Sequence, residues 1–333
     1  MTRAEQLNIA QANKRDEFYT QLCDIEAELV HYKHHFAGKT VYCNCDDPSK
    51  SNFTRFFIQN FHNLKLRKLT CSCYKPCPTG LFAEKHDEHA SYLEYDGTEK
   101  SNAPKMLKGN GDFRSKECLK LLESADIVVT NPPFSLFRDF LKTLVSYDKK
   151  FIIIGNVNAI SYKECFSLIQ KGKMWLGRSI HSGDREFRVP DDYPLDAAKV
   201  RIDEKGNRYV NVKGVRWFTN LKYTGMNNGL DLKKRYNPEE YPKFDNVDAI
   251  NVSKTKDIPY DYNGLMGVPI TFIDKFDPRQ FIIIGNEYML NIPGGRCYLN
   301  GQRMYSRIFI KRITNEKSQH LDKQSVLTNN ISI

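Results

Sequence analysis

The residues best suited to chemistry in this chain are Asn131-Pro132-Pro133-Phe134. Two consecutive prolines lack backbone N–H groups and stiffen the turn that contains them. The carbonyl oxygens of Asn131 and Pro132 then act as fixed acceptors beside an amide side chain and an aromatic ring. Such a site fits a planar amine, because two acceptors can take its N–H bonds while the ring stacks on its face. The tetrapeptide alone also fits a structural Pro-Pro turn after a strand.

The segments around this motif predict its place in a sheet. A β-branched run at residues 126–130 predicts a buried strand that ends directly before the motif. Apolar residues at helical spacing follow at 136–144, and residues 151–155 predict a second strand. Strand, helix and strand in this order predict a βαβ unit in a parallel sheet. The motif would then lie at the carboxyl edge, where open α/β sheets bind ligands.

Other elements are predicted by the same patterns. Residues 16–36 and 53–61 predict helices, and residues 40–43 and 68–71 predict strands. Residues 75–105 are rich in Pro, Gly, Lys, Glu and His, which is typical of an insertion. The letters Phe-Ile-Ile-Ile-Gly-Asn occur at 151–156 and again at 281–286. We interpret them as two buried strands of similar composition and not as a structural repeat.

Length and composition restrict the class of protein. The 333 residues predict about two domains, or one large domain with an added lobe. With 40% hydrophobic residues a disordered chain is excluded, and no run approaches the roughly 18 apolar residues of a membrane span. Nine cysteines and a polar start predict reduced thiols in a cytoplasmic compartment. The net charge of +10 moderately favours a polyanionic partner.

The tetrapeptide matches the (Asp/Asn/Ser)-Pro-Pro-(Tyr/Phe) motif of S-adenosylmethionine-dependent amino methyltransferases. Longer blocks resemble the EcoRI-type adenine methyltransferases of that class, and they are spread over about residues 14–275. These blocks lie at residues 16–21, 42–48, 109–115, 126–136, 248–252 and 261–272. The chain is therefore identified as a member of the EcoRI-type family. The resemblance implies an α/β class I (Rossmann-like) methyltransferase fold, with a largely parallel sheet and an appended target-recognition lobe.

The resemblance also implies the reaction and the partner. A methyl group would pass from S-adenosylmethionine to N6 of an adenine flipped out of double-stranded DNA, within a GAATTC-type palindrome. The implied catalytic residues are Asn131, Pro132, Pro133 and Phe134. Asn131 and the Pro132 carbonyl would accept hydrogen bonds from the target amine, and Phe134 would stack on the flipped base. The resemblance further implies a monomer without membrane contact, and a restriction endonuclease acting on the same sequence without direct contact.

The implied cofactor site draws on several blocks. Its residues are Phe18, Tyr19, Thr20, Cys43, Asp46, Asp47, Asp112 and Phe113. Asp46 and Asp47 stand where this fold normally has a Gly-rich turn. One of these acids could pair with the cofactor's ammonium group, or could cap the helix that follows. Asp112 would accept from the amine of the cofactor's adenine, with Phe113 against its face.

A basic cluster at Arg178, Arg185 and Arg188 would hold phosphates or read guanine edges, although a solvated charged face is the plainer alternative. The expected layout is a cofactor-binding catalytic core at 1–160, with the insertion at 75–105. A target-recognition region at 161–265 would be interleaved with that core. Strands at 266–315 would complete the core, and 316–333 would form a disordered tail.

Two further questions concern metal and substrate. Five cysteines cluster near two predicted strand ends, but their spacing differs from paired Cys-x-x-Cys ligands, so no metal site is predicted.

The tetrapeptide at residues 131–134 also occurs in enzymes that methylate protein glutamine or adenine in RNA. A catalytically silent DNA-binding protein of the same fold is the alternative from another class. The positive charge favours nucleic acid over protein, and the EcoRI-like blocks favour DNA over RNA.

Overall fold

The structure is a computed structural model that describes residues 18–75, 89–101, 103–181, 184–189, 200–224, 226 and 229–313. The chain divides into two compact units. The first comprises Met1–Phe166 and Met174–Thr224, and the second comprises Ser167–Lys173 and Gly225–Ile333. The region 161–265, expected to form one recognition lobe, is therefore divided between the two units. Among the described residues, no helix is long and apolar enough to cross a membrane.

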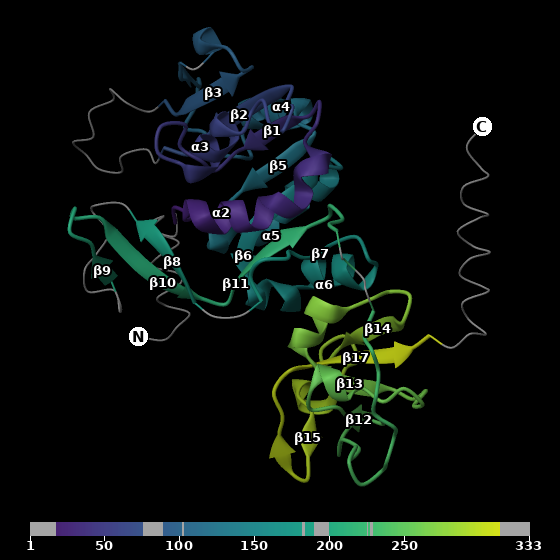
Figure 1. Ribbon diagram of the computed structural model, residues 1–333. Helices are drawn as coiled ribbons and strands as arrows, with labels where there is room; N and C mark the ends of the chain where they lie inside the picture. The colour runs from purple at the N-terminus through teal and green to yellow at the C-terminus, as the bar shows by residue number, and fades with distance from the viewer. Residues whose placement is uncertain are drawn as a thin grey trace, which may run out of the picture. The chain divides into compact units, whose positions relative to one another are not determined.

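The first unit contains an eight-stranded sheet in the order β4-β3-β2-β1-β5-β6-β11-β7 (Figure 1). Its strands are β1 (Thr40–Cys43), β2 (Lys68–Ser72), β3 (Ser91–Tyr95), β4 (Lys105–Met106), β5 (Ile127–Thr130), β6 (Lys150–Asn156), β7 (Trp175–Leu176) and β11 (Val215–Thr219). The four central strands, β2, β1, β5 and β6, are parallel. The strands on either side pair antiparallel. The predicted α/β class with a parallel central sheet is confirmed.

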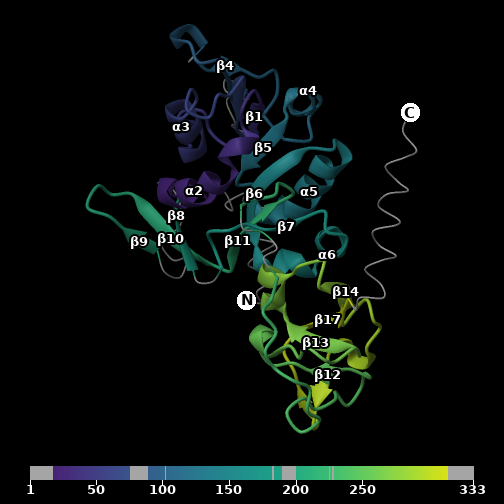
Figure 2. The same cartoon turned by 45° about the vertical axis from the view of Figure 1, so that its right-hand side comes forward.

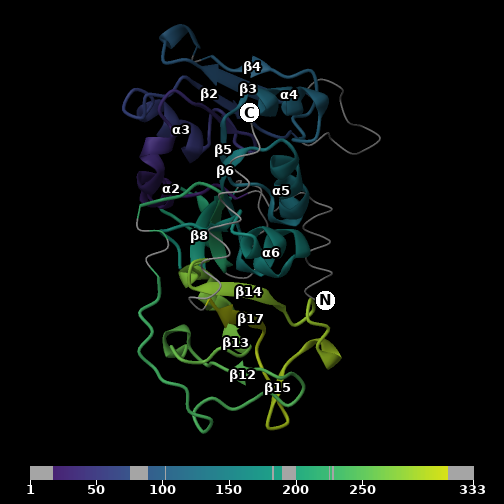
Figure 3. The same cartoon turned by 90° about the vertical axis from the view of Figure 1, so that its right-hand side faces the viewer.

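Helices cover both faces of this sheet, with α2 and α3 on one face and α4 and α5 on the other (Figure 3). Their bounds are α2 (Leu22–Leu29), α3 (Asn52–Gln59), α4 (Lys116–Ser124) and α5 (Phe137–Ser146). The apolar face of α3 buries Phe53, Phe56 and Phe57, which explains the aromatic spacing in the sequence. The predicted βαβ unit is confirmed as β5, α5 and β6. Strand β6 is buried on both faces, as expected for a central parallel strand.

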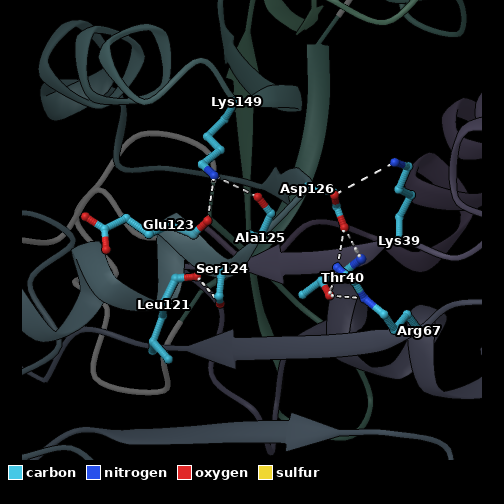
Figure 4. Close-up of polar contacts among 9 residues, drawn as sticks. All are labelled: Lys39, Thr40, Arg67, Leu121, Glu123, Ser124, Ala125, Asp126 and Lys149. Carbon is cyan, nitrogen blue, oxygen red and sulfur yellow. Dashed lines mark hydrogen bonds and ion pairs between the residues drawn. The ribbon is translucent and has the colours of Figure 1, made fainter.

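Polar side chains make contacts at the starts of the four central strands (Figure 4). Asp126 lies directly before β5, and its Oδ2 accepts from the Thr40 backbone N–H at 2.8 Å and from Arg67 Nη2 at 2.9 Å. Lys39 Nζ is 3.8 Å from Asp126 Oδ1. Lys149 donates to two carbonyl oxygens at the end of α4. These contacts fix the amino edge of the sheet, opposite the edge that carries the motif.

Removal of the Asp126 carboxylate is expected to destabilise this edge. Asp126→Ala removes the acceptor of the Thr40 N–H and one of the two acceptors of the Arg67 guanidinium, so the free energy of unfolding should fall by about 1.5–3 kcal/mol. Lys39→Ala is the matched control and should cost less than about 1 kcal/mol, because its ion pair is long and exposed. Urea unfolding followed by circular dichroism measures both values. Equal losses in the two variants would contradict this role for Asp126.

The segment 75–105, expected to be an insertion, contributes two strands to the main sheet. Strand β3 pairs antiparallel with β2, and β4 pairs antiparallel with β3. These residues extend the main sheet at one edge. Their polar composition fits this position because strands at the edge of a sheet bury few side chains: in β3, next to the edge strand β4, only Leu93 is buried. Residues 76–88 lie outside the described part of the chain.

A second sheet of the first unit is small and antiparallel, in the order β8-β10-β9 (Figure 2). It consists of β8 (Asp184–Val189), β9 (Val200–Ile202) and β10 (Arg208–Lys213). Its buried residues are Phe187, Val189 and Val210, which belong to the same hydrophobic core as α2 and α3. In the chain this sheet lies between β7 and β11 of the eight-stranded sheet, within the region where the resemblance implies target recognition.

The second unit has its own four-stranded sheet in the order β12-β13-β17-β14. Its strands are β12 (Ile250–Asn251), β13 (Met266–Pro269), β14 (Phe281–Asn286) and β17 (Arg307–Arg312), and β15 (Tyr298–Leu299) pairs with β16 (Gln302–Arg303). These strands, which are expected to complete the catalytic core, form a sheet of their own in the second unit. Strand β14 carries the same six letters as β6, yet it is buried only at alternate positions. The tail predicted at 316–333 lies outside the described residues.

The remaining helices are short. They are η1 (Val30–His35), η3 (Glu99–Ser101), η4 (Phe134–Leu136), η5 (Val157–Ser161), α6 (Lys163–Gln170), η6 (Thr255–Asp257), η7 (Ile270–Lys275) and η8 (Pro293–Gly295). The helix predicted over 16–36 thus begins at Leu22 and tightens to a 3-10 helix after Leu29. Residues 16 and 17 lie outside the described range.

Candidate active site

A pocket opens at the carboxyl edge of the first unit's sheet, with about 1130 Å³ of empty space that includes open solvent. Open α/β sheets bind their ligands at this edge. It is formed by the segments after β1, β2 and β5, together with residues 18–19 and 111–114. The predicted site residues that line it are Phe18, Tyr19, Asp46, Asp47, Asp112, Phe113, Asn131 and Pro133. Blocks far apart in the sequence therefore converge on one cavity.

Four predicted site residues do not line the pocket: Thr20, Cys43, Pro132 and Phe134. The Cys43 side chain is fully buried in the hydrophobic core that also contains Phe53 and Phe57 of α3. The side chains of Thr20 and Pro132 are buried beside the pocket. Phe134 packs edge-on against Phe18, with 5.7 Å between the ring centroids.

The sequence analysis missed several lining residues: Asn44, Cys45, Cys73, Tyr74, Gly111, Arg114, Ser135 and Leu136. Most of them are immediate neighbours of predicted residues and lie within the matched blocks. Cys73 and Tyr74 follow β2 and carried no motif. Only the parallel pairing of β1 with β2 could have indicated them.

Asn131 holds the N-terminal segment and keeps one acceptor unused. Its Nδ2 donates to the Phe18 carbonyl oxygen at 2.7 Å, which determines the orientation of the amide. Its Oδ1 is buried and accepts no hydrogen bond from any residue that the structure describes. A buried acceptor without a donor costs about 1–3 kcal/mol, so an amine arriving here would gain a hydrogen bond that is otherwise missing.

Residues 18–20 connect the motif with the three-stranded sheet. The Phe18 ring contacts both Phe134 and Phe187 of β8, with centroids 5.7 and 5.6 Å away. Tyr19 and Arg188 exchange backbone hydrogen bonds of 2.9 and 3.2 Å. Asn52 Nδ2 donates to the Thr20 carbonyl oxygen at 2.8 Å. The segment is thus fixed from α3, from β8 and from the motif.

Asp46 lines the pocket and is itself buried. Its Oδ1 accepts from Ser51 Oγ at 2.6 Å, and its Oδ2 accepts from Thr130 Oγ1 at 2.5 Å. Burial raises the pKa of Asp46 to about 6, and the nearby charge of Asp47 adds to the rise. The hydrogen bonds from Ser51 and Thr130 oppose that rise in pKa. Asp46 is therefore a carboxylate whose charge a nearby cation would stabilise.

The sequence left open that Asp46 or Asp47 caps the helix that follows. In the structure neither of these acids caps α3. Ser51 is the N-cap of α3, and its Oγ accepts from the Phe53 backbone N–H at 3.0 Å. The same hydroxyl donates to Asp46, so Asp46 supports the cap and does not form it. Asp47 Oδ1 accepts from the backbone N–H and the hydroxyl group of Ser49.

Asp112 and Phe113 present a carboxylate beside a buried ring. The Asp112 carboxylate accepts from Arg114 Nε at 2.9 Å and from Nη2 at 2.7 Å. The same guanidinium lies over the Phe113 ring, 5.3 Å from its centroid. A flat group with N–H donors thus already makes both contacts that the resemblance implies for an adenine. These two residues can therefore receive a planar amine.

Gly111 allows this loop to pass close to the end of β2. Its φ is +76°, in the left-handed region, and a Cβ built on it would lie 1.9 Å from the Cys73 carbonyl oxygen. Beside it, Lys75 N–H donates to the Asn110 carbonyl at 2.8 Å. Only glycine fits this backbone without movement of the neighbouring strand.

A family model described as the adenine-specific methyltransferase EcoRI matches residues 6–330. The chain belongs to this family. It is 48% identical over 316 residues to the Type II methyltransferase M.EcoRI of Escherichia coli, covering 92% of this chain and 95% of that protein. It is 39% identical over 326 residues to the Type II methyltransferase M.MpnI of Mycoplasma pneumoniae, covering 92% and 98%. No solved structure matches the chain. Methyltransferases of this kind use S-adenosylmethionine.

The three arginines predicted to contact DNA have different surroundings. Arg178 and Arg188 are exposed. Arg185 lies on the same face of β8 as the buried Phe187, and its Nε is 3.6 Å from Asp24 Oδ1 of α2. Side chains alternate along a strand, so Arg188 projects from the opposite face. Arg178 and Arg188 fit the predicted role better than Arg185, which is engaged with α2.

Glu28 of α2 is a further residue that the sequence analysis missed. It is fully buried, and its carboxylate accepts from the backbone N–H groups of Arg178 and Ser179 at 2.8 and 2.6 Å. Tyr32 Oη donates to it at 2.7 Å. Glu28 thereby anchors the segment that leads into β8. A buried glutamate in an amphipathic helix pattern was the signal that could have found it.

The cysteines show no arrangement for a metal within the described part of the chain. No group of three or more His, Cys, Asp or Glu side chains there could hold an ion. Cys43 and Cys71 are register partners in β1 and β2, and both are buried. Burial raises the pKa of the Cys43 thiol well above its ordinary value. Cys77, one of the five cysteines near the two predicted strand ends, lies outside the described residues.

Proposed function

We propose that this chain transfers the methyl group of S-adenosylmethionine to N6 of an adenine in double-stranded DNA, within the sequence GAATTC. The buried, unsatisfied Oδ1 of Asn131 carries the proposal, because it is an acceptor on a residue that lines the pocket at the carboxyl edge of the sheet. The names of the relatives support DNA as the substrate. The identity with M.EcoRI over most of both chains supports the recognition sequence.

The residues of the pocket fit S-adenosylmethionine. Asp46 and Asp47 supply negative charge for its cationic methionine part. Phe113 and Asp112 supply a ring face and an acceptor for its adenine. Asn44 also lines the pocket, and its Oδ1 is buried without a donor among the described residues, as expected where a ligand completes the hydrogen bonding.

In the proposed mechanism the chain acts mostly by positioning. Asn131 Oδ1 accepts one N–H of the target amine, and the Pro132 carbonyl is its expected second acceptor. Both draw electron density toward the nitrogen. The amide is neutral, so it orients the amine and does not act as a strong base. The Phe134 ring, now edge-on to Phe18, must turn to stack on the flipped base. The bound cofactor supplies an electrophilic methyl group on its sulfonium.

We also propose how the protein contacts DNA and where it acts. Arg178 and Arg188 are the exposed cations that we assign to phosphate contacts, which are sensitive to salt. The protein is proposed to act as a monomer in the cytoplasm of a prokaryotic or phage-infected cell. A restriction endonuclease would act on the same sequence without touching it.

Cofactor affinity is expected to depend on pH through Asp46. Its pKa is raised from 3.8 to about 6, so folding favours its protonated form. Protonated Asp46 therefore stabilises the folded protein below about pH 4, and this contribution to the free energy of unfolding is lost as the pH rises through about 6. A cationic ligand needs the charged form, so affinity should rise about tenfold from pH 5 to pH 7.

Calorimetry with S-adenosylmethionine in the absence of DNA measures this step in affinity. Asp46→Asn should remove the step. Asp47→Asn should keep it at slightly lower pH, because the Asp47 charge helps to raise the pKa of Asp46. An unchanged step in Asp46→Asn would show that another group titrates.

A test of substrate class incubates the protein with radiolabelled S-adenosylmethionine and equal amounts of duplex DNA, RNA of the same sequence, and protein. The expected result is label in DNA alone, recovered after digestion as N6-methyladenine. Label in RNA or in glutamine would favour the corresponding alternative. Cofactor and DNA binding without any transfer would favour the silent DNA-binding protein.

A further inference from the structure

We propose that Thr130 is a positioning residue for methyl transfer. Its hydroxyl group donates a hydrogen bond to the Asp46 carboxylate, which we assign to cofactor binding, and Thr130 itself lies at the strand end that leads to Asn131. The inference rests on the proposed function and adds to it a residue outside the predicted site. Thr130 is the last residue of β5 and directly precedes Asn131. It does not line the pocket itself.

The geometry of this contact is short and fully enclosed. Thr130 is 0% exposed, and its Oγ1 donates to Asp46 Oδ2 at 2.5 Å. The other carboxylate oxygen accepts from Ser51 at the start of α3. The Asp46 backbone N–H donates to the Ser72 carbonyl oxygen at the end of β2, at 2.9 Å. One carboxylate therefore joins the segments after β1 and β5 to α3, and its own backbone joins them to β2.

The reaction makes this connection important. In-line transfer needs the methyl group and the amine in one alignment, and a misplacement of about 1 Å can cost about 100-fold in rate. Asp46 is assigned to the cofactor side and Asn131 to the amine side. The hydrogen bond from Thr130 to Asp46 links those two sides through side chains. Without it, each side would keep its own contacts but lose their common alignment.

The hydroxyl group of Thr130 also stabilises the charged form of Asp46. Two titratable groups interact with the Asp46 carboxylate: the charge of Asp47 disfavours its ionised form, and the buried Cys43 thiol has its own pKa raised by it. The donors that favour the ionised form are the hydroxyl groups of Ser51 and Thr130. Removal of the Thr130 hydroxyl therefore shifts the pKa of Asp46 further upward.

The experiment compares Thr130→Val with Thr70→Val. Both replace a buried threonine of the central sheet by an isosteric residue, but Thr70 Oγ1 has no hydrogen-bond partner among the described residues. We expect Thr130→Val to lower kcat about 10- to 100-fold, and to move the acid limb of the pH profile upward. Thr130→Ser keeps the hydroxyl and should restore most of the rate. Thr70→Val should match the wild type both in kcat and in the acid limb of the pH profile.

A merely structural role would lower the thermal midpoint without moving the pH profile. Wild-type kcat and an unchanged acid limb in Thr130→Val would overturn the proposal, as would equal losses in Thr70→Val. If Thr130→Val does not fold, Thr130→Ala against Thr130→Ser gives the same comparison. The pH dependence of S-adenosylmethionine binding without DNA gives a second readout. If the wild type binds the cofactor but methylates no DNA, the proposed function fails, while this readout still tests the link between Thr130 and Asp46.

Discussion

Asn131→Ala is expected to lower kcat for methyl transfer by about 10²- to 10³-fold, the loss typical for removal of one preorganised polar group at a reacting centre. The variant removes the buried Oδ1 that no described residue satisfies, and with it the acceptor that orients the amine. The Kd of S-adenosylmethionine should change by less than about threefold, because the cofactor contacts assigned to Asp46 and Phe113 remain. Single-turnover kinetics with calorimetry separates the two quantities.

The matched control for this variant is Asn52→Ala. Asn131 also holds the Phe18 carbonyl, so its loss could act through the N-terminal segment. Asn52 holds the same segment at the Thr20 carbonyl but supplies no acceptor to the motif. Asn52→Ala should weaken cofactor binding slightly and leave kcat near the wild-type value. If Asn131→Ala weakens cofactor affinity as much as it lowers kcat, its role is structural.

Gly111→Ala is expected to abolish cofactor binding or to prevent folding of the pocket. The alanine Cβ would overlap the Cys73 carbonyl oxygen at 1.9 Å, and the φ of +76° is itself unfavourable for alanine. Either the end of β2 or the loop bearing Asp112 and Phe113 must move. We expect the Kd of S-adenosylmethionine to rise more than about 100-fold, or the free energy of unfolding to fall by about 3 kcal/mol or more.

Gly109→Ala serves as the control in the same block. A Cβ at Gly109 would meet no atom within 4 Å. This variant should bind the cofactor like the wild type and unfold at nearly the same temperature. Similar losses in the two variants would show that the loop tolerates no side chain for some other reason. Wild-type binding by Gly111→Ala would show that the close approach to Cys73 is not required.

The parts of the fold that depend on local pattern could be predicted from the sequence. The unit of β5, α5 and β6 follows from a β-branched run, a helical spacing and a second apolar run, and it places Asn131 at the carboxyl edge. The cofactor-binding residues of the pocket were expected from whole blocks of resemblance. A bare Asp-Phe pair such as Asp112 and Phe113 would not by itself indicate a cofactor site.

The parts that depend on pairing could not be predicted. Cys43 was assigned to the site although its side chain faces the core, because a shift of one residue along a strand reverses the face. Cys73 and Tyr74 enter the pocket only through the pairing of β2 with β1. The identical letters of β6 and β14 lie in different sheets, where different neighbours decide the burial.

The most direct measurement of the central claim is mass spectrometry of a duplex that contains one GAATTC site, after incubation with S-adenosylmethionine. We predict one added methyl group per strand, recovered as N6-methyl-2′-deoxyadenosine. It should be absent from a duplex in which the adenines of the site are replaced by purine, which lacks the amino group. Methylation of cytosine, or equal methylation of the purine-substituted duplex, would contradict the assignment of Asn131 as the acceptor for an adenine amine.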